Sequence, residues 1–180
     1  REFAMQLDRG LHSVDEFWLI ARRGSRLKEI ASSMQHTVKI LPLDLTNEAD
    51  MTVLTESLAE EKPVVRMLIN CAGYGMMGDF TAVPIKEQTG EVDLNCRALL
   101  EVTYGCLPYM RAKSRIIQLA SSAAFLPQPG FSVYAATKSF VLSFSKALRA
   151  ELKERQIYVT AVCPGPVKTE FFEVAEHYAS

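Results

Sequence analysis

Short apolar runs alternate with longer amphipathic segments along this chain, and this alternation limits the possible folds more than any other feature. Five runs read as strands, at residues 16–21, 37–43, 64–70, 114–120 and 157–163. Helical spacing marks the segments at 22–34, 47–61, 84–112 and 132–154. Strands that alternate with helices of this length form parallel sheets whose two faces are covered by helices. The sequence therefore predicts an α/β fold with a doubly wound parallel sheet.

Size and charge exclude several classes of partner. The 180 residues fit a single domain over residues 1–180. The net charge is −1, and the 20 basic and 21 acidic residues are scattered, which argues against a nucleic-acid or anionic membrane partner. No apolar stretch approaches the roughly 18 residues that cross a bilayer, and the first residues do not resemble a secretory signal.

The cysteines and histidines carry no metal or disulfide pattern. The 4 cysteines lie far apart without a Cys-x-x-Cys pair, which predicts reduced thiols in a cytoplasmic protein. The 3 histidines share no metal-ligand spacing with one another or with a cysteine, so no metal site is expected.

Polar residues and glycines gather directly after the apolar runs, at the carboxyl ends of the predicted strands. Ligands of open parallel sheets bind beyond the carboxyl ends of the strands. These strand-end residues are Ala21-Arg22-Arg23, Asp44-Leu45, residues 70–73, Ser121-Ser122 and Pro164-Gly165. Their common position predicts a binding site at this edge.

A Tyr-x-x-x-Lys pair occurs twice, at Tyr109 and Lys113 and at Tyr134 and Lys138. Residues four apart share one face of a helix, so either pair could act together. The first pair follows Pro108 at the predicted end of a helix, remote from the carboxyl edge, where a lysine in the last turn is an ordinary solvated charge. Tyr134 instead opens the helix that follows the fourth strand. We therefore expect Tyr134 and Lys138 to meet the strand-end hydroxyl of Ser121.

These residues resemble the active site of the short-chain dehydrogenase/reductase family, in which a strand-end serine lies thirteen residues before Tyr-x-x-x-Lys. Further motifs follow in family order: PLDLT (42–46), LINCAG (68–73, with Cys71 in place of the second Asn), DLNCRA (93–98) and CPGPVKT (163–169). The resemblance covers the whole chain and implies a Rossmann-like fold. The family's glycine-rich turn and the strand before it are absent, and the chain stops shortly after Thr169, before the family's substrate-covering segment.

Reduction of a ketone by hydride transfer leaves an alkoxide that needs a proton, and Tyr134 is the predicted general acid/base for a carbonyl or secondary alcohol substrate. The unperturbed pKa of a tyrosine is about 10, and the nearby Lys138 ammonium is expected to lower it. Ser121 would hold the substrate oxygen near the phenol. By resemblance, Asn95 would anchor a water that links Lys138 to solvent; a hydrogen bond within its own helix is the alternative.

The segment after the second family strand, IARRGSR, has no acidic residue to bind a ribose 2′-hydroxyl, whereas an arginine accommodates a 2′-phosphate. We therefore predict NADP(H) over NAD(H), with Arg22 as the main contact. Asp44 could accept from the adenine amino group or only cap its own loop. Ala72 and Gly73 allow a close approach of the backbone to the dinucleotide. The resemblance adds these cofactor contacts: Leu45, Asn70, Tyr134, Lys138, Pro164, Gly165, Val167 and Thr169.

By resemblance the absent first strand lies at the centre of the sheet, so its loss would leave two half-sheets with unpaired backbone groups. We expect about a dozen further residues before Arg1, a strand plus the phosphate-binding turn. The alternative function is an inactive scaffold that acts through protein binding. A serine hydrolase is disfavoured because no Gly-x-Ser-x-Gly is present. The family often pairs through its long helices, here residues 86–112 and 132–154, which suggests a homodimer or homotetramer.

Overall fold

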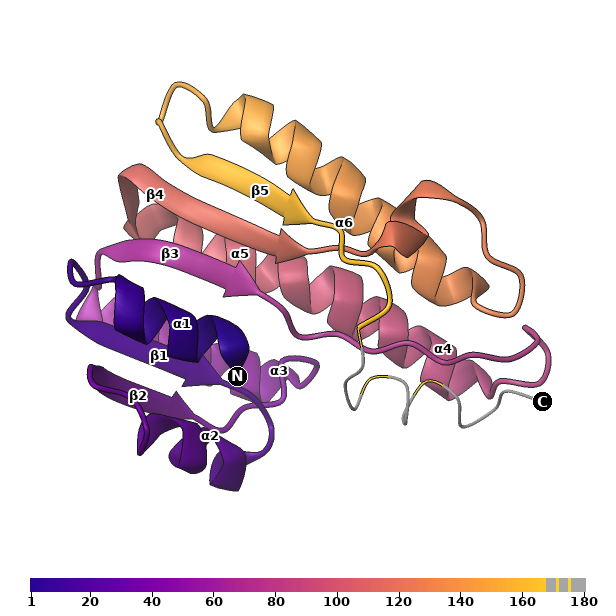
Figure 1. The fold of residues 1–180 in the computed structure, drawn as a ribbon, viewed down its shortest axis with the longest axis horizontal. Coiled ribbons are helices and arrows are strands. Elements are labelled where there is room, and N and C mark those ends of the chain that lie inside the picture. The colour runs from indigo at the N-terminus through magenta and orange to yellow at the C-terminus, as the bar shows by residue number, and fades with distance from the viewer. Residues whose placement is uncertain (168–170, 172–174, 176–180) are drawn as a thin grey trace. The chain divides into compact units, whose positions relative to one another are not determined.

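The computed structural model describes residues 1–167, Phe171 and Ala175. The chain divides into two compact units, Arg1–Ser57 and Leu58–Ser180, and each is described by itself (Figure 1). A single domain over residues 1–180 stays a prediction.

The first unit is built on a two-stranded parallel sheet. Strand β1 (Glu16–Ile20) pairs with β2 (Thr37–Leu41) along its whole length, from Glu16 opposite Thr37 to Ile20 opposite Leu41. The helices of this part of the chain are α1 (Glu2–Gly10), α2 (Gly24–Ala31) and the beginning of α3 (Glu48–Glu61).

A buried carboxylate fixes α1 against the turn that leads into β2. Asp8 accepts hydrogen bonds from the backbone N–H groups of Gln35 and His36, at 2.9 and 3.0 Å, and lies 2.8 Å from Nδ1 of His36. The Gln35 bond in particular holds the pKa of Asp8 below its usual range. This carboxylate therefore has a structural role.

The second unit carries a three-stranded parallel sheet in the order β3-β4-β5. Its strands are β3 (Val65–Asn70), β4 (Met110–Leu119) and β5 (Tyr158–Val162). Its main helices are α4 (Ile85–Val92), α5 (Leu99–Cys106) and α6 (Ser132–Glu151). Helices α5 and α6 lie against one face of this sheet (Figure 1).

The core of this unit joins α6 to the central and edge strands. Its fully packed members are Met110, Ile116, Leu148, Leu152, Ile157 and Val159. A second cluster of Leu99, Ala120 and Val141 lies where β4 ends, between α5 and α6. Because residues of α6 are buried at both places, the start of this helix is held firmly next to the carboxyl end of β4.

The predicted helix at 84–112 ends earlier than expected. After α4 the chain makes a π-helical turn at Asp93–Ala98, continues as α5, and closes with a 3₁₀ turn at Leu107–Tyr109 before β4 begins at Met110. Pro108 lacks a backbone N–H and cannot continue the helix. The prediction that Lys113 lies in the last turn of a helix was therefore wrong: it lies in β4 with φ +70°. Tyr109 and Lys113 remain at the amino end of β4, away from the carboxyl edge.

All five predicted strands are present, and their pairing is parallel, but they form two sheets instead of one. Among the described residues, β1 pairs with β2 alone and β3 pairs with β4 alone. The strand ends at residues 70–73, 121–122 and 164–165 therefore share one edge of the three-stranded sheet. The other two predicted strand ends, at 21–23 and 44–45, belong to the two-stranded sheet.

No helix in the described ranges is long and apolar enough to cross a membrane. The described residues also contain no group of three or more His, Cys, Asp or Glu side chains that could hold a metal ion. Cys71, Cys96, Cys106 and Cys163 are all free thiols.

Candidate active site

Ser121 lies just beyond the carboxyl end of β4. It caps the short 3₁₀ helix Ser122–Phe125, and its Oγ accepts from the backbone N–H of Ala123 at 3.1 Å. The same hydroxyl lies close enough to the phenol of Tyr134 to lower the pKa of that phenol. The next residue, Ser122, donates its backbone N–H to the carbonyl oxygen of Pro164 at 2.9 Å, which ties the ends of β4 and β5 together.

Tyr134 and Lys138 come from the first two turns of α6, and both are buried. Nζ of Lys138 lies 5.6 Å from the centroid of the Tyr134 ring. The same Nζ donates to the carbonyl oxygen of Leu119 at 2.8 Å, the last residue of β4. The structure thus brings together the polar ends of Ser121, Tyr134 and Lys138 where β4 ends.

The protonation properties of this group differ from our expectation. Burial raises the pKa of Tyr134, the Ser121 hydrogen bond opposes this, and the negative charge of Glu91 adds to it. The predicted lowering of the Tyr134 pKa by Lys138 is therefore wrong for this structure. Burial disfavours the charged form of Lys138 and lowers its pKa to about 8. Its Nζ donates to the Leu119 carbonyl.

Asn95 clamps the loop after β3 to α6. Its Oδ1 accepts from the backbone N–H of Tyr74 at 3.1 Å, and its Nδ2 donates to the Tyr74 carbonyl at 2.8 Å and to Oγ1 of Thr137 at 3.0 Å. The side chain is fully buried and projects from the π-helical turn, a distortion that is frequent at functional sites. The alternative of a hydrogen bond within its own helix was wrong, since each partner lies outside that helix. Its predicted contact with a water stays a prediction.

Two glycines bring the loop after β3 against these side chains. A β-carbon at Gly73 would lie 2.8 Å from Oδ1 of Asn95 and 3.4 Å from Nζ of Lys138. A β-carbon at Gly75 would lie 2.7 Å from Cγ of Tyr134 and 2.9 Å from Cε2 of Phe131. Sequence reasoning assigned no role to Gly75, although the repeated glycines of the GYG segment were a signal for close approach.

The ring of Tyr134 is held by an aromatic neighbour as well. Phe131, just before α6, stacks on it with centroids 4.3 Å apart and an angle of 18° between the planes. Stacking and burial leave the phenol little freedom to rotate. Sequence reasoning missed this contact, for which the signal was an aromatic residue three positions earlier.

Asn70 has a structural side chain. Its Nδ2 donates to Oγ1 of Thr103 and to Oε1 of Gln118, both at 2.9 Å, and Nε2 of Gln118 donates to Thr103 at 3.2 Å. This network joins β3, α5 and β4 beneath the strand ends. A cofactor contact by Asn70, which stays a prediction, would therefore fall to its backbone.

In the first unit, Arg22 follows β1 and is exposed, and Asp44 follows β2. Oδ1 of Asp44 accepts from the N–H and the hydroxyl of Thr46, at 3.0 and 2.7 Å. Asp44 therefore caps its own loop, which was one of the two predicted roles. These bonds, and then the charge of Arg22, lower the pKa of Asp44. Leu45 beside it is half-buried.

The remaining predicted cofactor residues flank the edge of the three-stranded sheet. Ala72 and Gly73 are exposed after β3, and Pro164, Gly165 and Val167 follow β5. A β-carbon at Gly165 would meet no atom of the described part of the chain within 4 Å, so packing among these residues does not require a glycine there. Thr169 lies outside the described residues.

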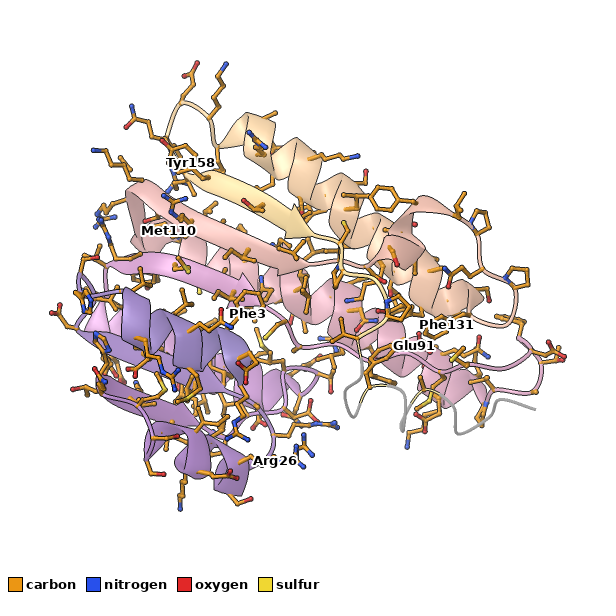
Figure 2. The ribbon with its side chains drawn as sticks, in the orientation of Figure 1. Phe3, Arg26, Glu91, Met110, Phe131 and Tyr158 are labelled. Carbon is orange, nitrogen blue, oxygen red and sulfur yellow. The ribbon has the colours of Figure 1, made fainter. Side chains whose placement is uncertain are left out.

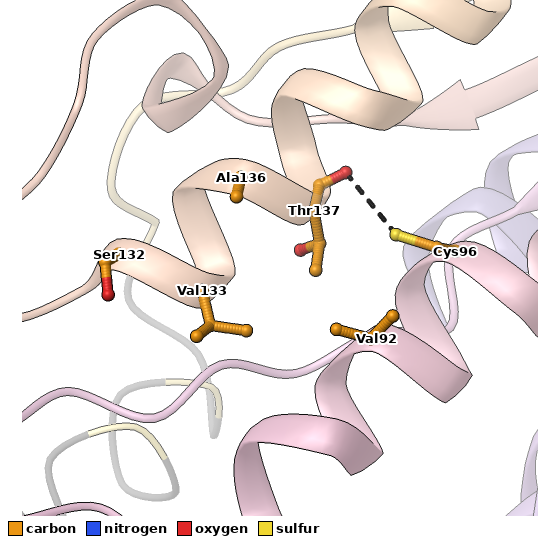
Figure 3. A pocket seen from close by; sticks show the side chains of 6 residues that line it. All are labelled: Val92, Cys96, Ser132, Val133, Ala136 and Thr137. Atoms are coloured by element: carbon orange, nitrogen blue, oxygen red, sulfur yellow. Dashed lines mark hydrogen bonds between the residues drawn. The ribbon is translucent and has the colours of Figure 1, made fainter. Parts of the chain in front are cut away.

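A groove of about 360 Å³ lies between α6 and the α4 region (Figure 3). It is lined by Val92, Cys96, Ser132, Val133, Ala136 and Thr137. The thiol of Cys96 lies 3.9 Å from the carbonyl oxygen of Thr137 across it. Its lining has no charged side chain and none of the predicted catalytic residues, so it offers no acid–base chemistry.

Comparison with known proteins identifies the family. The sequence model described as short chain dehydrogenase matches residues 11–178. The chain belongs to the short-chain dehydrogenase family. The family predicted from the motifs is thereby confirmed, and the fold class is confirmed by solved structures of the same family.

Three members of this family are similar over most of the chain. Serine 3-dehydrogenase from Rhizobium radiobacter is 32% identical over 163 residues, which is 88% of this chain and 66% of that protein. A short-chain dehydrogenase from Sphingobium yanoikuyae in complex with NADPH is 30% identical, with a TM-score of 0.83 over 95% of this chain and 68% of that one. The closed form of a serine dehydrogenase complexed with NADP⁺ is also 30% identical, with a TM-score of 0.84 over 94% of this chain and 69% of that one. The chain thus spans about two thirds of these relatives.

Proposed function

We propose that this chain is an NADP(H)-dependent oxidoreductase that interconverts a carbonyl compound and a secondary alcohol. The observation that carries the proposal is the meeting of three polar ends at the carboxyl end of β4: the hydroxyl of Ser121, the phenol of Tyr134 and the ammonium of Lys138. A hydroxyl, a weak acid and a cation in one place are what proton transfer to a developing alkoxide requires.

Tyr134 is the general acid in reduction and the general base in oxidation. The Ser121 hydroxyl acts on this phenol, so a substrate oxygen bound between them would contact both groups. Ser121 orients that oxygen, and its own orientation is fixed by the Ala123 N–H. When bound, the nicotinamide supplies or accepts the hydride.

Lys138 fits a contact with the cofactor ribose. An ammonium has three donors, and only one of these is used by a described residue, the carbonyl of Leu119. Two donors are left on a buried cation that has no carboxylate partner among the described residues, which suits a diol such as a ribose.

The glycine that follows β5 also fits a dinucleotide. A side chain at Gly165 would meet no atom of the described residues, so the conformation and packing of this part of the chain do not explain the glycine. A ligand that approaches the backbone there would explain it. This supports the predicted contacts of Pro164, Gly165 and Val167 with the cofactor.

The preference for NADP(H) rests on Arg22, whose guanidinium is exposed just beyond β1 without an acid beside it in sequence. A guanidinium binds a 2′-phosphate through paired hydrogen bonds. The solved relatives that hold NADPH and NADP⁺ support this preference.

The proposal is tested by following NADPH fluorescence with a panel of ketones and aldehydes. We expect turnover of at least one carbonyl compound and loss of that turnover in Ser121→Ala. No turnover, together with no binding of NADPH, would favour an inactive scaffold instead.

Cofactor preference is tested separately by titration with NADPH and NADH. Arg22→Ala should weaken NADPH binding by roughly 10- to 100-fold and leave NADH binding unchanged, as expected for a lost charge-assisted hydrogen bond. Lys28→Ala, a neighbouring exposed cation on α2, is the matched control. Equal affinities of the native chain for the two cofactors would contradict the preference.

A further inference from the structure

Glu91 on α4 is a buried carboxyl group, and one of its oxygens has no partner among the residues that the structure describes. Its side chain is 1% exposed. Oε1 accepts from the backbone N–H of Met76 at 2.9 Å, whereas Oε2 has no hydrogen-bond partner within residues 1–167, Phe171 and Ala175. An ionised carboxylate with open lone pairs is costly in such a place, so the residue calls for an explanation. Glu91 and Phe131 both lie beyond the carboxyl ends of β3, β4 and β5 (Figure 2).

The groups around Glu91 favour its neutral form near neutrality. Burial raises its pKa to about 7, the Met76 N–H opposes this, and the charge of Glu87, one turn earlier on α4, adds to it. From α6, the group on which the charge of Glu91 acts is the phenol of Tyr134. In the described part of the chain no basic side chain acts on it. Its charge therefore changes within the physiological range.

Two routes connect Glu91 to Tyr134. The first is mechanical: Met76, which Glu91 holds, directly follows Gly75, and Gly75 lies against the rings of Tyr134 and Phe131. The second is electrostatic, because a negative Glu91 opposes a negative phenolate. Both routes end on the residue that we assign as the acid/base.

We propose that Glu91 is a positioning residue that holds the Gly75–Met76 segment against Tyr134 and that, when charged, keeps Tyr134 in its phenol form. The catalytic consequence rests on the proposed function. Reduction uses the phenol as proton donor, whereas oxidation needs a phenolate to accept the proton of the alcohol. Ionised Glu91 therefore disfavours alcohol oxidation and preserves the form required for carbonyl reduction.

The coupling can be measured without substrate or cofactor. The full chain, labelled with ¹⁵N and with ¹³C at Cζ of tyrosine, is titrated from pH 5 to 9 by NMR. We expect the Met76 amide and the Tyr134 Cζ resonances to shift together, with a shared midpoint near pH 7. In Glu91→Gln, whose amide oxygen still accepts from Met76, both resonances should stay constant over this range. Tyr134→Phe assigns the tyrosine signal.

Glu87→Gln is the matched control, because it removes a carboxylate from the same helix that does not contact Met76. Both shifts should persist in it, with a midpoint at slightly lower pH. The proposal is overturned if neither resonance of the native chain titrates near neutrality, or if the shifts remain in Glu91→Gln. Both of these NMR results can be interpreted whether or not the chain reduces ketones.

Activity supplies the second readout. For any secondary alcohol that the native chain oxidises, Glu91→Gln should be faster at pH 8, because loss of the negative charge lowers the pKa of Tyr134. Ketone reduction at pH 6 should be unchanged. A complete absence of turnover would count against the proposed function, while the NMR titration would still decide the coupling.

Discussion

Nζ of Lys138 donates a hydrogen bond of 2.8 Å to the carbonyl oxygen of Leu119, and this contact joins the helix that carries Tyr134 to the strand that ends next to Ser121. The lysine is 6% exposed, and its pKa falls to about 8 because burial disfavours the ammonium. A buried cation of this kind lowers the stability of the fold while placing a charge where the proposed reaction uses it.

Lys138→Met should stabilise the fold at neutral pH and abolish activity. Because the pKa of Lys138 in the folded state lies below the usual lysine value of 10.5, the folded state binds fewer protons than the unfolded state between about pH 8 and 10.5. The free-energy cost of burying the Lys138 ammonium is therefore fully present below pH 8, and it disappears as the pH rises from about 8 to 10.5. Removing the buried charge should raise the free energy of unfolding by about 3 kcal/mol, and loss of the Leu119 hydrogen bond should lower it by about 1 kcal/mol.

Chemical denaturation at pH 7 and at pH 10 measures this difference. The advantage of Lys138→Met should be about 2 kcal/mol at pH 7 and should shrink at pH 10. Lys146→Met, an exposed lysine two turns later on α6, should show no such dependence on pH. If the native chain is at least as stable as Lys138→Met at pH 7, the buried ammonium does not lower the free energy of unfolding.

Gly75→Ala should displace either the loop after β3 or the ring of Tyr134. The added β-carbon would lie 2.7 Å from Cγ of Tyr134, and stacking on Phe131 prevents the ring from moving freely. Overpacking of this kind costs about 1–3 kcal/mol, and a displaced phenol should also slow turnover. Gly10→Ala, at the end of α1 where a β-carbon meets nothing, is the control for denaturation. Equal stability of both variants would contradict the close packing at Gly75.

Asn95→Ala should be among the more damaging substitutions for stability. It removes the hydrogen bonds of Asn95 to the N–H and C=O groups of Tyr74 and to the Thr137 hydroxyl, which keeps its bond to the Tyr134 carbonyl, at a cost of about 2–4 kcal/mol. Thr137→Val should cost about 1 kcal/mol alone and less in the Asn95→Ala background, since the two share a hydrogen bond. Denaturation of the single and double variants checks this. Strict additivity would mean that the Asn95–Thr137 bond contributes nothing.

Part of this arrangement could be predicted from the sequence, because strands and strand ends have local signals. The apolar run before Ser121 and the helical spacing after Ser132 placed Tyr134 and Lys138 at the correct edge. Pro108 could have indicated the end of the preceding helix, but the apolar character of residues 107–110 suits a helix and a strand equally.

The remainder depends on contacts between residues far apart in the chain. Asn95 bonds Tyr74 across 21 positions, and no local pattern reveals that its side chain holds a loop. Glu91 had a weak signal, an acid four positions before Asn95 on one helix face, but its burial is visible only in three dimensions. The raised pKa of Tyr134 likewise follows from packing around the phenol, which a lysine at the expected spacing does not disclose.

The most direct measurement compares Tyr134→Phe with Tyr109→Phe in NADPH-dependent turnover of a carbonyl substrate. Both substitutions remove one phenol from a Tyr-x-x-x-Lys pair, but only Tyr134 lies with a serine hydroxyl and a buried ammonium. We expect Tyr134→Phe to lower kcat by about 100-fold or more with NADPH binding retained, and Tyr109→Phe to match the native chain. Comparable turnover by Tyr134→Phe and the native chain would contradict the assignment of Tyr134 as the acid/base.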